Sequence, residues 1–589
     1  MQDLMDQGST PTGIHHRIRQ ISGINKLESI FASFSITEKA LFLLAGGILA
    51  LGTLSVLHKL SDHFTVEIPA RGGSLVEGII GTPRFINPLL ATSDADKDLS
   101  TLVYSGLLKG TPTGELVPDL ALRYSVSDDG LVYSFVIRDD AVFHDGKPLT
   151  ADDVEFTILK VQDSTLKSPR QVSWDGVTVA KTGTHEISFT LKKPYAPFIN
   201  NLTIGILPKH IWQNFQSDQF PFSSFNAEPI GSGPYKIVSV SRSSQGIPTS
   251  MTLKANRSNA LGEPYITNLS LNFYSNDKAL KEAILNGSVE SGSNLSPATA
   301  TEIASQTRIV EAPLTRIFGI FFNQNNKEIL AHKAVRQALS LSIDKQSIID
   351  TVLMGYGSIA TEPVPPTSEV SFTQDIERAQ EVLTKDGWKL NASTSEFELK
   401  GKSGTTPLSF SLSTANVPEL VDAAKHIEED WLSAGIKTDV KIFESSDLNQ
   451  TIIRPRKYEA LLFGMVTGTN PDLYAFWHSS QRNDPGLNVS MYTNAKADKL
   501  LETMRQTADT AELAEQYASF AKEIETDSPA VFLWSPNFIY AIPDRIKGVS
   551  LGQITSPSDR FLDIEHWYTD TDQIWKVFEQ KKTTDESLN

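Results

Sequence analysis

The residue types that carry out most protein chemistry are present, but not at catalytic spacings. The eleven histidines are scattered, and no His-Glu-x-x-His zinc pattern occurs. His144 lies beside Asp145 without a third ligand near it in the sequence, which favours a polar surface contact over a metal site. Neither the Gly-x-x-x-x-Gly-Lys-Ser/Thr phosphate loop nor a Gly-x-Ser-x-Gly nucleophile turn is found. We therefore predict a protein that is not an enzyme and that uses no cofactor or metal.

Two further patterns with chemical potential have structural explanations. Asp152 and Asp153, like the acidic run 428–430, lie on stretches that we expect to be helical with an apolar opposite face, so these carboxylates are predicted to be solvated. Gly231 and Gly233 resemble the start of a phosphate-binding loop, but the residues after them have the composition of a strand. Phosphate binding needs a helix N-terminus at that point. We predict a tight turn before a strand.

Aromatic side chains lie in or near loops that follow strand-like apolar runs. The loop 467–478 follows the run 461–463, and Trp534 lies near the end of the run 531–535. Ligands of α/β proteins bind beyond the carboxyl ends of strands, and an indole offers a large contact area with one hydrogen bond. These positions are candidates for a ligand site. Core or hinge packing is the alternative for Trp534 and for Trp477.

The elements that must position such loops follow an α/β pattern. In the segment 408–443, a strand-like alternation is followed by an apolar helical stripe and a second strand-like run, with Gly435 at the end of the helix. Strand, helix and strand in this order predict parallel pairing. A half-buried strand is predicted over 131–137, and Thr150 with Asp153 predicts a capping box at a helix start.

The overall composition excludes several classes of protein. The chain has 589 residues, which corresponds to about four domains by length alone, and 40% of them are hydrophobic, as in folded globular proteins. Its formal net charge is −17, so we expect no nucleic-acid partner. The absence of cysteine excludes disulfides, thiolate metal sites, a cysteine nucleophile and a lipid-modified N-terminal cysteine.

The strongest membrane signal is the uncharged apolar run 40–57. As a helix it would be roughly 27 Å long, enough for a thin bilayer. Because 39 residues precede it and no Ala-x-Ala-like site follows it, we predict an uncleaved single-span anchor. A cleaved signal peptide and a buried helix are the alternatives. The numbers of lysine and arginine residues near its two ends are equal. Counting the whole N-terminal tail slightly favours a cytoplasmic N-terminus.

Five ordered groups of residues carry a family resemblance. They lie at 102–108 with 118–121, at 127–130 with 143–154, at 231–235, at 322–323 with 335–345, and at 470–472 with 491–494. Together they resemble the family 5 extracellular solute-binding proteins, which are the oligopeptide, dipeptide and nickel receptors of ABC importers. The resemblance runs from about residue 74 to about residue 568.

The resemblance implies an α/β, two-lobed, class II periplasmic-binding-protein-like fold with an extra domain in the first lobe and ligand capture by hinge closure. It implies a monomeric receptor that takes an oligopeptide or dipeptide and delivers it to an ABC-type importer. The main domain then lies on the extracytoplasmic side of the cell membrane. By analogy the parts are a cytoplasmic tail (1–39), the anchor (40–57), a linker (58–73), lobe I (74–98, 229–314 and 534–570), the inserted domain (99–228), lobe II (315–533) and a C-terminal tail (571–589), in which we expect a short helix.

The sequence departs from the family at one position of interest. Peptide-binding members carry an aspartate, which pairs with the peptide's α-ammonium, where this chain has Thr467. A hydroxyl brings no charge to a desolvated ammonium. Either another carboxylate substitutes, Asp472 being the nearest candidate, or the ligand has no free amine. By the resemblance we predict Thr467, Asn470, Asp472 and Trp534 as ligand-binding residues. The alternative function is a membrane-tethered module for sensing or for a non-peptide solute.

Overall fold

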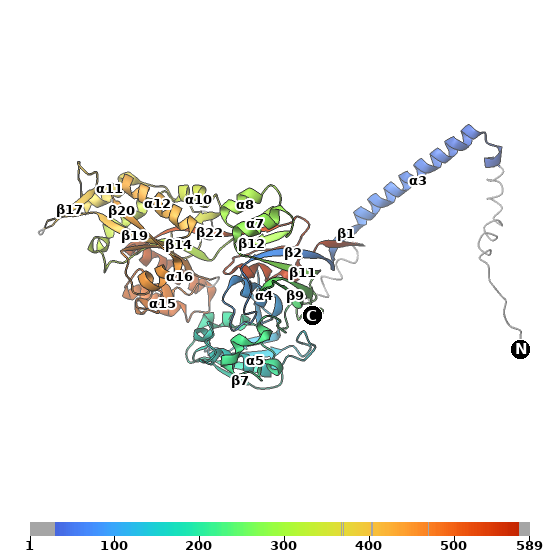
Figure 1. Ribbon diagram of the computed structural model, residues 1–589, viewed down its shortest axis with the longest axis horizontal. Helices are drawn as coiled ribbons and strands as arrows, with labels where there is room; N and C mark the ends of the chain where they lie inside the picture. Colours follow the sequence, from blue (N-terminus) through green and yellow to red (C-terminus); the bar gives the residue numbers. More distant parts are fainter. Residues whose placement is uncertain (1–29, 367, 369, 402–403, 469–470, 576–589) are drawn as a thin grey trace. The chain divides into compact units, whose positions relative to one another are not determined.

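The protein consists of two compact units, residues 1–69 with 571–589, and residues 70–570 (Figure 1). The structure is a computed structural model that describes residues 30–366, 368, 370–401, 404–468 and 471–575.

The first unit contains a long apolar helix and a small sheet. Helix α3 (Ile36–Phe64) has a mean hydropathy of 1.8 over Ile36–Val56, and none of that window is buried. Among the described residues it is the helix long and apolar enough to cross a membrane, and it covers nearly all of the predicted run 40–57. Part of the expected linker is ordered, because α3 continues to Phe64 and strand β1 (Thr65–Ala70) follows.

The prediction of a short helix near the C-terminus is wrong for the residues that the structure describes there. Residues Asp570–Trp575 form strand β23, which pairs with β1. The two partners lie at opposite ends of the chain, so no local pattern could indicate the pairing. Val577 and Phe578, which contributed to that expectation, lie outside the described residues.

The second unit is built on one mixed sheet, in which the described residues supply twelve strands in the order β20-β19-β21-β14-β22-β12-β2-β11-β10-β9, with β13 and β15 also paired to β22. These strands are β2 (Gly72–Ile80), β9 (Tyr235–Arg242), β10 (Pro248–Ala255), β11 (Ile266–Tyr274), β12 (Ser291–Ser293), β13 (Arg308–Pro313), β14 (Arg316–Phe322), β15 (Gly357–Ile359), β19 (Ser409–Ala415), β20 (Lys437–Phe443), β21 (Ala460–Val466) and β22 (Ala530–Ile542).

Helices cover both faces of this sheet. The main ones are α4 (Asp94–Val103), α7 (Asp277–Leu285), α8 (Pro297–Ile303), α9 (Lys333–Leu341), α10 (Lys345–Thr351), α11 (Ile376–Lys385), α12 (Pro418–Ser433), α15 (Ala495–Met504) and α16 (Thr510–Asp527). In Figure 1, α10, α11 and α12 lie on one side of β14, β19 and β20, and α15 and α16 lie on the other. This layering is the α/β arrangement that the sequence predicts.

Buried apolar side chains of the described residues form four clusters, which divide into two cores along the chain. The first core comes from residues 75–314 and 538–567, and the second core comes from residues 317–534. Strand β22 runs through both, since Trp534 packs in the second core and Phe538 in the first. Two cores joined by a shared strand give the two-lobed organisation that the sequence predicts.

The most regular unit of the sequence folds as expected. Strands β19 and β20 pair in parallel, with Phe410 opposite Thr438, and α12 connects them. The predicted stripe faces inward, with Leu420, Ile427 and Trp431 buried. Gly435 ends the helix with φ of 86°, a left-handed conformation that glycine adopts without steric cost.

A four-stranded sheet lies within the segment expected as the inserted domain. It contains β5 (Ala121–Val126), β6 (Val132–Ile137), β8 (Glu186–Thr190) and β7 (Thr178–Lys181), in that order, and helix α5 (Ala151–Gln162) packs beside it. The predicted alternation in β6 and the capping box of Thr150 and Asp153 are both confirmed. The expectation that Asp153 is solvated is wrong, because its carboxylate is buried and accepts from the amides of Thr150 and Lys209. Nearby, β3 (Leu108–Gly110) pairs with β4 (Leu116–Pro118), and β16 (Lys389–Leu390), β17 (Phe397–Gly401) and β18 (Gly404–Pro407) form a separate small sheet.

The glycine cluster before β9 is a turn, as predicted. The amide of Gly233 donates to the carbonyl of Val103 at 2.8 Å, and a Cβ at Gly231 would lie 2.0 Å from that same oxygen. These glycines therefore allow a close approach of two backbone segments. That explains the motif without a phosphate.

Candidate functional site

A cavity of about 540 Å³ lies against the first core. Parts of the segments 88–119, 170–205 and 553–562 form its walls, and Gly468, which follows strand β21 of the second core, reaches its edge. A volume of this size is within the range of small-molecule and short-peptide sites. Among the described residues the lining comes from first-core segments, apart from Gly468 on the second-core side, and this cavity is the candidate ligand site.

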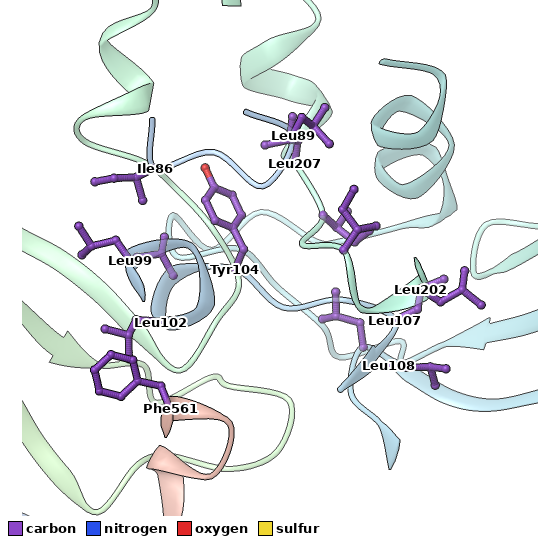
Figure 2. Close-up of a cluster of buried hydrophobic side chains, with 14 of the residues drawn as sticks. Ile86, Leu89, Leu99, Leu102, Tyr104, Leu107, Leu108, Leu202, Leu207 and Phe561 are labelled. Carbon is purple, nitrogen blue, oxygen red and sulfur yellow. The ribbon is translucent and has the colours of Figure 1, made fainter. Parts of the chain in front are cut away.

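Helix α4 and the residues after it position one wall of the cavity. Ser93 caps the helix through the amide of Asp96, and Leu99 and Leu102 anchor its inner face. Figure 2 shows the Tyr104 ring on the side of Ile86 and Leu89, while Leu102 lies beside Phe561. The wall is therefore rigid, held by burial of apolar side chains from segments far apart in the sequence.

Some polar atoms of this wall have no hydrogen-bond partner within the described part of the chain. They are Ser100 Oγ, Tyr104 Oη and Asp119 Oδ1, and the residues that carry them all line the cavity. Burial raises the pKa of Tyr104, so its hydroxyl stays protonated at neutral pH. Buried polar groups are normally paired. Unpaired ones beside a cavity indicate a surface suited to a polar ligand.

The accessible charges of the cavity are cationic. The Arg170 side chain is exposed, and its guanidinium makes no hydrogen bond or ion pair with the described residues, although surrounding protein lowers its pKa by desolvation. Lys97 also lines the cavity and is attracted to Asp559 without an ion pair. The chain as a whole has a net charge of −17, so unpaired cations in its cavity are a local departure that suits an anionic ligand group.

The carboxylates beside the cavity are less accessible. Asp119 is only 4% exposed, and burial raises its pKa to about 6 even though Lys109 lies near it. The Lys109 ammonium is itself paired with Glu565. No carboxylate among the described lining residues is therefore both exposed and unpaired, because Asp559 is engaged with the amides of Thr555 and Ser556.

A fully paired charge cluster lies directly behind this wall. The Arg560 guanidinium donates to Glu77 Oε1 at 2.8 Å and to both carboxylate oxygens of Asp98 at 2.9 and 2.8 Å. Tyr540 and Ser291 donate to the second oxygen of Glu77 at 2.6 and 2.9 Å. All of these side chains are buried. The cluster ties β2, α4, β12 and β22 together.

The predicted site residues lie in different surroundings. Thr467 is 7% exposed, and its amide and hydroxyl donate to the carbonyl of Thr315 at 2.9 and 3.2 Å. It is next to Gly468, so the structure brings it to the edge of the cavity without making it a lining residue. Asn470 lies outside the described residues.

The other two predicted residues are not brought to the cavity. Asp472 forms an ion pair with Arg505 at 2.7 Å, so its charge is already compensated. Trp534 is 2% exposed and stacks on Phe318, with 5.1 Å between ring centroids. Trp477 is a core residue at 1% exposure, the packing role that the sequence analysis gives as the alternative to ligand binding. Ligand contact by the four predicted residues stays a prediction.

One group of side chains has the residue types of a metal site. Ligand atoms of Asp563, Glu565 and His566 lie within 4.8 Å of one another. However, Glu565 is paired with the Lys109 ammonium, and His566 Nδ1 is 2.5 Å from Asp563 Oδ1. The Lys109 ammonium and the contact between His566 and Asp563 already engage these groups, although Glu565 Oε2 has no hydrogen-bond partner among the described residues, and we assign no metal to them.

The cavity residues Lys97, Tyr104, Asp119 and Arg170 were missed as site residues by sequence reasoning. Tyr104 and Asp119 fall within the segments that carry the family resemblance, which is the signal that could have found them. Lys97 and Arg170 have no such signal, since a surface lysine or arginine is ordinary in any sequence.

The comparisons with known proteins agree with a two-lobed α/β fold. The family described as bacterial extracellular solute-binding proteins, family 5 Middle, matches residues 115–486. The oligopeptide-binding protein AppA of Bacillus subtilis is 31% identical over 519 residues, which cover 85% of this chain and 92% of that protein.

Solved structures give the same result. The structure of AppA from Bacillus subtilis in complex with a nonapeptide has a TM-score of 0.65 at 30% identity and covers 85% of this chain and 100% of that one. The crystal structure of NikZ from Campylobacter jejuni in complex with Ni(L-His) has a TM-score of 0.68 at 26% identity, with 84% and 99% covered.

The fold and its cavity define a binding protein of the two-lobed α/β class. The chain belongs to the family 5 extracellular solute-binding proteins. Its relatives include an oligopeptide-binding protein of Bacillus subtilis and a dipeptide-binding protein of Escherichia coli. This family consists of solute-binding receptors.

Proposed function

We propose that this protein is a membrane-tethered receptor that captures a peptide between its two lobes and delivers it to an ABC-type importer. The observation that carries the proposal is the cavity against the first core, which Gly468 of the second-core side also lines, with unpaired cations in a protein of net charge −17. The lobe limits proposed from the resemblance are 74–98, 229–314 and 534–570 for lobe I, 99–228 for the inserted domain and 315–533 for lobe II.

The charges favour recognition of the carboxylate end of a peptide. Arg170 and Lys97 line one cavity, and a guanidinium can bind a carboxylate through two parallel hydrogen bonds. Of the two residues considered for the amine end, Thr467 is uncharged and Asp472 is paired with Arg505. A receptor of this kind selects ligands by a free carboxylate and tolerates a blocked amine.

Helix α3 would hold this receptor at the membrane. Its exposed apolar window Ile36–Val56 is long enough to span the bilayer, and we propose a single crossing with residues 1–35 in the cytoplasm and the second unit outside. A signal sequence is the competing role of the same helix. Western blotting of the membrane fraction for an epitope placed at residue 2 distinguishes them, because cleavage would remove the epitope from the mature chain.

Binding of defined peptide pools tests the proposal. The probes are a random pentapeptide pool with free carboxyl ends and the same pool amidated, each titrated calorimetrically into the protein after denaturation and refolding to remove bound ligand. We expect the free-acid pool to bind and the amidated pool to bind at least about tenfold more weakly, the effect of losing a charge-assisted contact. Failure of both pools would contradict peptide capture.

A metal–amino acid complex is the second candidate ligand. NikZ, similar in fold and 26% identical, is described in complex with Ni(L-His). The carboxylate of such a complex could meet the same two cations. Binding of nickel with L-histidine, together with failure of both peptide pools, would favour this ligand class.

A further inference from the structure

A contact between the two cores lies away from the cavity lining. The Tyr195 hydroxyl donates to Asp472 Oδ2 at 3.1 Å, and the amide of Ala196 donates to the carbonyl of Arg505 at 3.0 Å. Tyr195 packs against the first core, just after β8, whereas Asp472 and Arg505 flank elements of the second core. Two hydrogen bonds from adjacent residues therefore join the two sides.

On the second-core side, contacts that do not involve Tyr195 hold Asp472 and Arg505 in position. Arg505 Nε lies 3.0 and 2.9 Å from the two oxygens of Asp472, and its Nη2 lies 2.7 Å from Oδ2. The guanidinium also lies 4.0 Å from the centroid of the Tyr474 ring. The Tyr517 hydroxyl binds the carbonyl of Pro471 and so fixes the loop beside Asp472. None of these contacts needs Tyr195.

The first-core side contributes Tyr195, through its aromatic ring and its hydroxyl. The Arg505 guanidinium is 5.3 Å from the Tyr195 ring centroid, so the ring contributes a cation–π contact as well as its hydroxyl. Burial and the nearby Asp472 raise the pKa of Tyr195 to about 12, so the hydroxyl remains a donor throughout the physiological range. The side chains are only partly buried, which allows the contact to open.

We propose that Tyr195, Asp472 and Arg505 form a clasp that holds the two lobes together without ligand and thereby sets part of the ligand affinity. This inference rests on the proposed function, capture between lobes. A contact made only in the closed state raises the population of that state, and apparent affinity rises in proportion to the binding-competent fraction. In this proposal the ion pair of Asp472 with Arg505 serves the contact between lobes and not a ligand.

The test measures lobe separation directly in the full-length chain in detergent. The sequence contains no cysteine, so Ser164→Cys and Lys499→Cys place two spin labels specifically, at exposed positions on the two sides. Pulsed electron–electron double resonance on this doubly labelled protein without peptide should show the short distance between labels that corresponds to closed lobes. With Tyr195→Phe, which keeps the ring and removes the hydroxyl, we expect the closed fraction to fall about fivefold relative to the open one.

Matched variants make the result specific. Tyr124→Phe removes the hydroxyl of a tyrosine that stacks on Phe135 in the four-stranded sheet, and should leave the distances unchanged. Arg505→Lys keeps the charge but loses the bidentate geometry, and should open the lobes as Tyr195→Phe does. Distances that are identical in Tyr195→Phe and in the parent would overturn the clasp.

Ligand binding separates this inference from the proposed function. The free-acid pentapeptide pool should bind Tyr195→Phe more weakly than the parent, by the factor by which the closed fraction measured with the spin labels falls and at most about fivefold. If the pool binds both proteins equally, the clasp is wrong and peptide capture stands. If the pool binds neither while the distances shift, the clasp stands and peptide capture is wrong.

Discussion

Two arginines near one cavity have opposite environments. Arg560 is 1% exposed, and its donors reach Glu77, Asp98 and the carbonyl of Pro557. Arg170 is exposed in the cavity and makes no side-chain hydrogen bond with the described residues. Arg560 sits immediately between two residues that line the cavity, Asp559 and Phe561. The two charges therefore lie close to the same cavity.

The difference separates a structural charge from a charge available to a ligand. A buried guanidinium persists only when each of its donors is paired, because desolvation otherwise outweighs its attraction to its partners. The N–H donors of an unpaired arginine beside a cavity are available to bind a ligand. The comparison predicts that substituting Arg560 damages stability and that substituting Arg170 damages binding.

The largest expected effect is on Arg560. Arg560→Met leaves Glu77 and Asp98 buried without a cation, so we expect the free energy of unfolding to fall by about 3–5 kcal/mol, measured by urea denaturation at pH 7.4. Arg257→Met is the control, since Arg257 is exposed and should change stability by less than about 0.5 kcal/mol. A loss below about 1 kcal/mol for Arg560→Met would mean that the cluster is not structural.

Asp119 sharpens the comparison, since it is a buried carboxylate that is not fully paired. Burial raises its pKa to about 6 from the usual 3.8. The folded state then holds a proton between these values that the unfolded state has lost, so stability falls as pH rises from about 4 to about 6. The destabilisation is complete above pH 6 and amounts to at most about 3 kcal/mol.

Asp119→Asn removes this titration. We expect the variant to be more stable than the parent by about 1–3 kcal/mol at pH 8 and to match it near pH 4, measured by urea denaturation across the pH range. Lys109, Arg138 and Glu565 are the charged groups that act on Asp119, and they are unchanged in the variant. An equal stability difference at both pH values would rule out Asp119 as its source.

The smallest effect on folding is expected for Arg170. Arg170→Gln should leave the free energy of unfolding within about 0.5 kcal/mol of the parent and weaken binding of the free-acid pentapeptide pool about tenfold or more. Calorimetry on the same samples measures the affinity for the free-acid pentapeptide pool, with Arg257→Gln as the control. If Arg170→Gln unfolded as readily as Arg560→Met, the distinction between the two arginines would fail.

Local patterns predicted much of the fold. The apolar stripe of α12, the alternation in β6 and the capping box at Thr150 each depend on residues a few positions apart, and each is confirmed. The glycines before β9 were predicted as a turn because their neighbours form a strand. These signals are short-range, so one sequence is enough to read them.

The site was predictable only in part, because its residues meet through long-range contacts. Asp472 looked available in the sequence, and its pairing with Arg505 and Tyr195 depends on segments that meet only in the fold. Trp534 looked like a cleft aromatic, but Phe318 of a neighbouring strand covers it. Arg170 has no local pattern that separates it from a surface arginine. Pairing and burial, which decide these roles, are properties of the folded chain.

Identifying what the protein carries tests peptide capture most directly. Native mass spectrometry of the chain from Thr65 to Asn589, purified without refolding and then denatured to release bound molecules, gives the ligand masses and their sequences. We predict a heterogeneous set of short peptides with free carboxyl ends, lost in Arg170→Gln. A single non-peptide mass that binds Arg170→Gln equally well would contradict both the ligand class and the role of the cavity cations.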